Sequence, residues 1–203
     1  MSVSNPDVLL PPRSVEISRQ TAETKIRGSL CLDGSGEAVV QTGLGFLDHM
    51  LCSLTKHAGF NLELRCEGDL HIDDHHTVED CALAIGAAVD LCLGDRRGIT
   101  RFGDAMVPLD EALARAAVDC GGRPWPAIDL GLRRERIGEV ACENLQHFLQ
   151  SLAMASRSNL HVDVLRGEND HHRVEAAFKA TAVALRKAVL RVSDQIPSTK
   201  GVL

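Results

Sequence analysis

Apolar and polar residues alternate along several short stretches in the first half of the chain, a pattern typical of half-buried strands. Clear alternation covers residues 15–19, 24–33 and 61–66, and a short strand is expected at 38–40. Across 46–57 the apolar residues instead recur every three or four positions, which predicts a helix. This half therefore mixes strands and helices.

The second half repeats that order. Strand-like stretches at 105–110 and 113–119 precede a helix that opens at Glu143, and a strand at 159–164 follows. Each half then ends in a longer helical pattern that starts at a pair of adjacent histidines. We therefore predict an internally duplicated α+β fold, with a sheet on one side and helices on the other in each half. The repeats should span about 14–96 and 97–193 of a single domain.

Composition narrows the class of protein. A chain of 203 residues can bury one good core, and residues 1–13 and 194–203 are expected to form a flexible arm and a tail. The net charge of −6, one Trp and no Tyr argue against a nucleic-acid partner. No apolar run is long enough for a membrane span, and the start lacks the layout of a secretory signal. Seven cysteines without a Cys-x-x-Cys pair favour a reducing cytoplasm.

The two histidine pairs begin the long helices within related sequences, Asp74-His75-His76-Thr77-Val78-Glu79 and Asp170-His171-His172-Arg173-Val174-Glu175. Residues four apart lie on one helix face, so the first histidine of each pair and the glutamate can bind one ion. The second histidine points about 100° away. One copy alone would be read as a polar helix start with an acid favoured by the dipole. Two copies at matching places favour metal binding.

Each half offers one more histidine on its earlier helix, His49 and His147. We predict two metal sites that each use both halves, within one chain or between chains. The predicted ligand sets are His49, His75, Glu79 and His172 for one site, and His147, His171, Glu175 and His76 for the other. Imidazoles with a carboxylate suit zinc, manganese or iron better than calcium. Asp73, Asp74 and Asp170 would orient ring nitrogens or only cap helices.

Several further residues are candidates for substrate chemistry. Glu23 lies at a strand entry where folding requires no acid, so it is an acid/base candidate or a surface carboxylate. His57 has no counterpart in the second half and is a surface histidine or a substrate contact. Basic residues near segment ends could together bind an anion, although each alone could be solvated charge: Arg101, Arg123, Lys179 and Lys200.

These sequences closely resemble the imidazoleglycerol-phosphate dehydratase family of histidine biosynthesis. The resemblance covers about residues 15–203 and rests on both histidine pairs, on residues 45–51 and 109–112, and on the C-terminal Ile196-Pro197-Ser198-Thr199-Lys200-Gly201. It implies two four-stranded mixed sheets covered by helices, Mn²⁺ as the usual metal, and a 24-subunit shell with active sites between subunits. It also implies phosphate contacts from Arg101, Arg123, Lys179, Ser198 and Lys200, and a proton shuttle at Glu23.

The implied activity is dehydration of D-erythro-imidazoleglycerol phosphate to imidazole acetol phosphate, with two metal ions binding the ring as imidazolate. The chain departs from the family pattern at Cys52-Ser53 and at Gln146, which puts a substrate contact and the surroundings of His147 in doubt. Two rivals remain: a two-metal phosphohydrolase, whose ligands are usually rich in Asp, and an assembly protein in which ions only join subunits.

Overall fold

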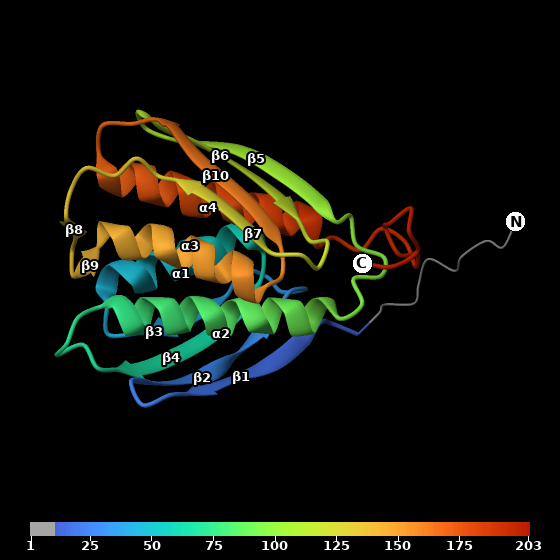
Figure 1. Cartoon of the computed structure of the whole chain (residues 1–203), viewed down its shortest axis with the longest axis horizontal. Helices are drawn as coiled ribbons and strands as arrows, with labels where there is room; N and C mark the ends of the chain where they lie inside the picture. The colour runs from blue at the N-terminus through green and yellow to red at the C-terminus, as the bar shows by residue number, and fades with distance from the viewer. Residues whose placement is uncertain (1–10) are drawn as a thin grey trace, which may run out of the picture.

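A computed structural model describes residues 11–203 as two four-stranded sheets with four helices between them. Figure 1 shows the first sheet below, the second sheet above, and the helices as a central layer. Residues 1–10, which form most of the expected N-terminal arm, lie outside the described part of the chain. The duplicated α+β class predicted from the sequence is confirmed.

The first sheet has the strand order β1-β2-β4-β3, in which only β3 runs parallel to its neighbour. Buried residues alternate with exposed ones, so the inward side chains meet the helices. The elements of this half are β1 (Ser14–Gln20), β2 (Thr24–Cys31), β3 (Ala38–Gln41), α1 (Gly45–Ala58), β4 (Asn61–Gly68) and α2 (His75–Leu93).

The second sheet has the equivalent order β5-β6-β10-β7, again with one parallel pair, between β7 and β10. Its elements are β5 (Phe102–Leu109), β6 (Ala112–Asp119), β7 (Trp125–Asp129), α3 (Cys142–Ala155), β10 (Asn159–Arg166) and α4 (Asp170–Ala188). A small hairpin, β8 (Arg136–Ile137) with β9 (Val140–Ala141), precedes α3. Neither β7 nor this hairpin shows the alternation on which the sequence analysis relied.

The helices of the two halves pack crosswise, α1 against α4 and α2 against α3. The centre of the core contains Phe148 of α3 and Phe178 of α4, whose ring centroids are 5.4 Å apart. Gly86 of α2 lies so close to α3 that an added Cβ would be 2.7 Å from the Cβ of Ala155. This crossed packing decides which histidines can meet.

The ends of the described chain make specific contacts. Arg13 donates to the carboxylate of Asp33 and to the carbonyl of Val189. The C-terminal segment follows α4 and bonds back to the loop before β5, where the Gly98 N–H donates to the Gln195 carbonyl over 2.8 Å. None of the helices in residues 11–203 is long and apolar enough to cross a membrane.

His71 lies outside the strands, because β4 ends at Gly68 and His71 falls in the turn before α2. The turn closes with a hydrogen bond from the Ile72 N–H to the Asp69 carbonyl. His161, in contrast, lies on β10 with its side chain exposed.

Candidate metal centres

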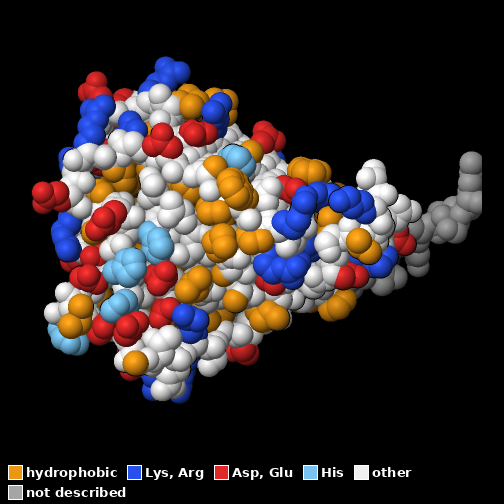
Figure 2. Space-filling model, in the orientation of Figure 1, with side chains coloured by type: hydrophobic (Ala, Val, Ile, Leu, Met, Phe, Trp, Pro, Cys, Tyr) orange, Lys and Arg blue, Asp and Glu red, His pale blue; other side chains and the backbone are white. Residues whose placement is uncertain are grey.

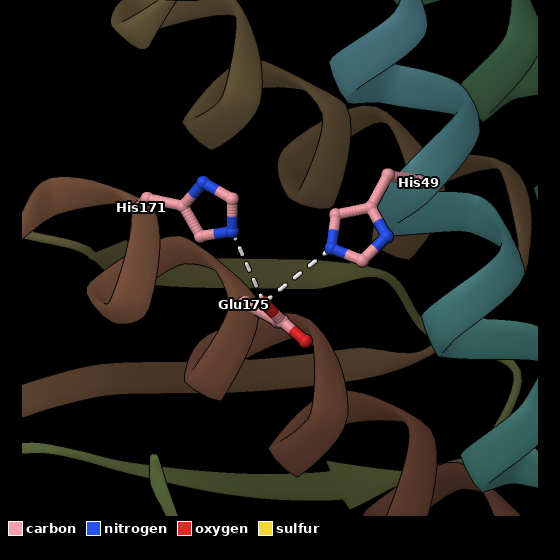
Figure 3. Close-up of side chains that lie close together, drawn as sticks. All are labelled: His49, His171 and Glu175. Carbon is pink, nitrogen blue, oxygen red and sulfur yellow. Dashed lines mark hydrogen bonds and ion pairs between the residues drawn. The ribbon is translucent and has the colours of Figure 1, made fainter. Parts of the chain in front are cut away.

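The first candidate centre combines His49 from α1 with His171 and Glu175 from α4 (Figure 3). Glu175 Oε2 lies 3.2 Å from His171 Nε2 and 3.4 Å from His49 Nε2. One donor atom from each of the three residues lies within 4.8 Å of the other two. Residues four apart on α4 thus form the clamp expected from helix geometry.

The second candidate centre has the same composition and joins α2 to α3. His75 and Glu79 of α2 meet His147 of α3, again with donor atoms within 4.8 Å of one another. His147 Nε2 is 2.8 Å from Glu79 Oε1, and the rings of His75 and His147 stack at 5.0 Å. Each centre therefore draws ligands from both halves of the chain.

Within the described chain, these ligands are grouped differently from the predicted sets. His49 was assigned to the clamp of His75 and Glu79, and His147 to that of His171 and Glu175. The structure exchanges the two histidines because α1 packs on α4 and α2 on α3. Periodicity within a helix cannot report which helices become neighbours.

The predicted ligand sets each required the second histidine of a pair as a fourth ligand. Within the described chain, neither His76 nor His172 joins a trio. His76 Nδ1 lies 3.0 Å from Asp69, and its Nε2 lies 3.6 Å from Glu23. His172 likewise has an acid near each ring nitrogen, but from different residues, Glu111 and Asp110. Both rings turn away from the trios because the helix rotates about 100° per residue.

His172 contacts two acids on the β5–β6 turn. Its Nδ1 is 2.8 Å from Glu111 and its Nε2 is 3.7 Å from Asp110. The Asn169 N–H and then His172 lower the pKa of Glu111 to about 2. The hydrogen bonds with Asp69 and Glu111 raise the pKa of His76 and His172 above the ordinary histidine value.

Buried polar residues fix the ring of His75. Asn144 Nδ2 donates to Asp74 over 2.9 Å, so Asn144 Oδ1 faces His75 Nδ1 at 2.9 Å as an acceptor. The Ala141 N–H also donates to Asp74. The protonated Nδ1 leaves the Nε2 lone pair of His75 free. The sequence analysis missed Asn144, although a buried Asn within an apolar helix face is a recognisable signal.

Other polar residues near the helix starts accept hydrogen bonds from the backbone. Asp73 accepts from the N–H of His75, the first residue of α2, and Asn169, the N-cap of α4, accepts from the His171 N–H. Asp170 is buried and accepts from the N–H groups of Arg133 and Arg134. Of the two alternatives for these acids, capping describes Asp73, while Asp74 orients His75 through Asn144.

Glu23 lies in the turn between β1 and β2, with an exposed side chain. Its carboxylate is close to the His76 ring, and its carbonyl accepts from the Asp69 N–H at 3.1 Å. Glu23 is therefore held at the edge of the first sheet beside one histidine pair, where folding does not require an acid.

Lys179 is the one candidate phosphate contact that lies beside a trio. Its Nζ is 2.8 Å from Glu175 Oε1, one helical turn away on α4. Burial raises the pKa of Glu175, but Lys179 and His49 together more than offset this, so the net pKa is below the ordinary value. Burial and the charge of Lys179 lower the pKa of His57, which places the exposed His57 side chain near the same part of α4.

The remaining predicted phosphate contacts lie at the opposite end of α4. The Arg101 N–H donates to the carbonyl of Ala188, the last residue of the helix. Ala188 lies thirteen positions after Glu175, which corresponds to about 20 Å of helix. Figure 2 agrees: histidines and acids gather at one end of the visible face, and a basic cluster lies near the C-terminal segment at the other.

That second end brings Arg101 and the tail together. Arg101 pairs with Asp119 at 2.7 Å and donates from Nη1 to the Pro197 carbonyl at 3.0 Å. The carbonyl carbon of Leu203 lies 3.6 Å from the position that a Cβ on Gly122 would occupy. The other predicted contacts in this region are Arg123, Ser198 and Lys200, of which Arg123 and Lys200 are exposed.

The two departures from the family pattern have local explanations. Gln146 Oε1 accepts from the Leu130 N–H at 3.5 Å, so it serves the backbone after β7 and not His147. Cys52 and Ser53 are half-buried on α1, and Ser53 Oγ has no hydrogen-bond partner among the described residues. Burial raises the pKa of the Cys52 thiol, which disfavours its thiolate form.

Both trios suit a transition-metal ion. Each supplies two imidazoles and one carboxylate, the donor types that zinc, iron and manganese accept. At His75, the orientation by Asn144 and Asp74 matches the support that metal-binding histidines receive in proteins. Three donors also leave coordination positions for a substrate.

Comparisons with known proteins identify the family and agree with the fold. A family model described as imidazoleglycerol-phosphate dehydratase matches residues 42–185. An imidazoleglycerol-phosphate dehydratase of Saccharomyces cerevisiae is 50% identical over 212 residues, which cover 92% of this chain and 96% of that protein. One of Phytophthora nicotianae is 58% identical over 192 residues, which cover 94% of this chain but 42% of that longer protein.

A solved structure gives the same picture in three dimensions. The crystal structure of imidazoleglycerol-phosphate dehydratase from Staphylococcus aureus superposes with a TM-score of 0.79 at 33% identity. The superposition covers 88% of this chain and 100% of that one. The shared architecture therefore extends over both halves.

Proposed function

The chain belongs to the imidazoleglycerol-phosphate dehydratase family, and we propose that it removes water from D-erythro-imidazoleglycerol phosphate by using two metal ions that bind the substrate's imidazole ring. Family membership makes the chain a lyase of histidine biosynthesis and confirms the resemblance found in its sequence. The proposed product is imidazole acetol phosphate.

The observation that carries the proposal is the pair of trios. His49, His171 and Glu175 would hold one ion, and the trio on α2 and α3 would hold the other. We infer Mn²⁺, by resemblance to the family and because the donors are nitrogen and oxygen. The bound ions would supply Lewis acidity that favours the imidazolate form of the ring, so that hydrogen and hydroxyl leave in separate steps.

Glu23 would carry the proton. Its exposed carboxylate stands beside His76 at the edge of the first sheet, where a substrate can reach it. A carboxylate placed beside the reacting carbon can accept its proton and return it to the departing hydroxyl, which leaves as water. The enol that remains then tautomerises to the ketone of the product.

The phosphate would be bound by residues of more than one copy. Lys179 is near Glu175, with the exposed His57 as a further substrate contact, whereas Arg101 and the tail lie about 20 Å along α4. The other proposed phosphate contacts lie at the same end of α4 as Arg101: Arg123, Ser198 and Lys200. The distance supports active sites that close between subunits of a homo-oligomer, for which the family resemblance suggests 24 copies.

The outer face of the second sheet also supports self-association. Phe102, Met106 and Trp125 are exposed there, at 58%, 62% and 64%. On the outer face of the first sheet, exposed positions such as Glu16 and Arg27 are polar, with Val39 as an apolar exception. Exposed apolar patches of this kind mark interaction surfaces.

We place the protein in the cytoplasm, because the described cysteines are all free thiols.

The reaction is tested by incubating the Mn²⁺-loaded protein with imidazoleglycerol phosphate. The proposal predicts formation of imidazole acetol phosphate without release of inorganic phosphate. Release of phosphate from the intact diol would instead favour the two-metal phosphohydrolase, the rival reading of a two-ion site.

A second experiment addresses the rival in which ions only join subunits. Glu23→Gln should lower kcat by about 10²- to 10⁴-fold, the usual contribution of a general acid–base group, while native mass and metal content stay unchanged. Glu67→Gln, which neutralises an exposed acid near the same turn, is the matched control. Full activity in Glu23→Gln would exclude Glu23 as the shuttle.

A further inference from the structure

His76 and His172, whose rings turn away from the trios, each have a carboxylate within hydrogen-bond distance of Nδ1. Asp69 occupies this position at His76, with Oδ2 at 3.0 Å, and Glu111 occupies it at His172, with Oε2 at 2.8 Å. A carboxylate only accepts hydrogen bonds, so the proton of each ring sits on Nδ1. In the neutral ring, Nε2 then carries the free lone pair, as in histidines that bind metal ions.

The two carboxylates come from different places in the repeat. Asp69 follows β4 directly, whereas Glu111 lies in the β5–β6 turn, immediately before Ala112. By its place before β6, Glu111 is the counterpart of Glu23, which immediately precedes Thr24 of β2. The same ring orientation is thus achieved from two unrelated positions.

Glu111 is itself held rigidly. Its Oε1 accepts from the backbone N–H groups of Glu168 at 3.1 Å and Asn169 at 2.9 Å, in the loop that leads into α4. Its Oε2 is left for His172. Three donors on one carboxylate fix its plane and therefore the direction of the ring.

The Nε2 side of each ring is also acidic. Glu23 lies 3.6 Å from His76 Nε2, and Asp110 lies 3.7 Å from His172 Nε2. Asp73 near His76 and Glu175 near His172 add further negative charge. A cation at either Nε2 would therefore be favoured by its surroundings.

We propose that Asp69 and Glu111 are positioning residues that fix His76 and His172 as Nε2 ligands for a metal ion presented by a second copy of this chain. The inference rests on the proposed function, since it assigns these histidines to the same metal chemistry. It assigns Glu111 a role in the second half that Asp69 has in the first.

Substitution of Glu111 by Gln tests the role of the hydrogen bond. The two backbone N–H groups require an oxygen at the Oε1 position, so the amide NH₂ would face His172 Nδ1. The ring would then keep its proton on Nε2 and could not bind a metal there. We expect the affinity for Mn²⁺ alone, measured by calorimetry on the full chain, to fall by about 10- to 100-fold.

Two controls separate positioning from charge and from folding. Glu168→Gln removes an exposed acid in the same loop and should bind Mn²⁺ like the wild type. In a His172→Ala background, Glu111→Gln should cause no further loss, because its effect acts through that ring. If Glu111→Gln fails to fold, Asp69→Ala tested with and without His76→Ala asks the same question in the first half.

Wild-type affinity in Glu111→Gln, or an equal loss with and without His172, would overturn the inference. The proposed function is tested separately by wild-type Mn²⁺ binding and dehydration. If both are present while Glu111→Gln binds normally, only the positioning role fails.

Discussion

His171 and His172 are adjacent, yet their rings have different partners: Glu175 for the first and Glu111 for the second. The helical rotation between neighbours is enough to separate an inward ligand from an outward one. The same division recurs at His75 and His76. At the scale of single residues, the angle between adjacent side chains at the starts of α2 and α4 therefore separates the trio histidines from their neighbours.

Asn144 gives a first test at this scale. Asn144→Ala removes the acceptor for His75 Nδ1 and one donor to the buried Asp74. We expect Mn²⁺ affinity to fall about 10- to 100-fold, the usual effect of losing such a partner. Unfolding free energy should fall by about 1–3 kcal/mol because a buried acceptor loses its donor.

Denaturation with and without Mn²⁺ checks both effects of Asn144→Ala. Glu143→Ala changes the exposed neighbour on α3 and should leave metal affinity intact. Unchanged affinity in Asn144→Ala would show that His75 does not depend on this support.

Because Arg13 pairs with Asp33, the free energy of unfolding should depend on pH in the acidic range. The hydrogen bond from Arg13 lowers the pKa of Asp33 in the folded protein. The pair therefore stabilises the fold above the unfolded pKa of about 3.9, and this contribution is lost as pH falls through the folded pKa. Solvent screens the pair, so its contribution is within about 1 kcal/mol.

The Asp33 prediction is checked by chemical denaturation of wild type and Asp33→Asn. The difference in unfolding free energy should be constant between about pH 6 and 8 and should narrow below about pH 4. A difference that stays constant down to about pH 3 would contradict the assignment.

At the scale of elements, the repeat explains why much of the fold could be predicted. Alternation marked β4 and β10, and helical periodicity marked α1 to α4, because one face of each is buried. The short β7 and the β8–β9 hairpin lack a periodic face and were not predicted. The helix that packs beside each clamp within the chain differs from the predicted one, because inter-helix packing depends on residues far apart in sequence.

Gly86 tests the packing that brings the second trio together. In an exposed helix, Gly→Ala stabilises by about 1 kcal/mol. Here the new Cβ would be 2.8 Å from the Leu152 carbonyl oxygen of α3, so we expect a loss of about 1–3 kcal/mol from overpacking.

Thermal and chemical denaturation of Gly86→Ala measure whether the substitution lowers or raises the free energy of unfolding. Ala87→Gly, at an exposed position on the same helix, calibrates the intrinsic helix preference and should destabilise by about 1 kcal/mol. A stabilised Gly86→Ala would show that α2 and α3 are not in close contact there.

At the scale of the whole molecule, the starts of α2 and α4, which carry trio residues, lie at the end of the helical layer opposite the C-terminal segment (Figure 1). The proposed active site needs both, so one copy should supply metal ligands and another should supply phosphate contacts. The resemblance predicted these residues by position in sequence, but neither it nor periodicity could place them in space.

Mixed assemblies test this division of labour. His171→Ala and Lys200→Ala should each be inactive alone, the first through metal binding and the second through phosphate binding. The two variants are then unfolded and refolded together with Mn²⁺. Some sites will combine the intact His171 of one variant with the intact Lys200 of the other, so part of the activity should return. Two copies of the same variant refolded together serve as the control, and no recovery in the mixture would place each site within one copy.

The central claim is that the metal ions bind the substrate's imidazole ring. The most direct measurement is pulsed electron paramagnetic resonance of the Mn²⁺-loaded protein with a non-reacting substrate analogue whose ring nitrogens are ¹⁵N. The account predicts ¹⁵N couplings from the analogue on Mn²⁺, in addition to those of the protein's histidines. A spectrum with phosphate coupling but no ¹⁵N coupling would contradict it.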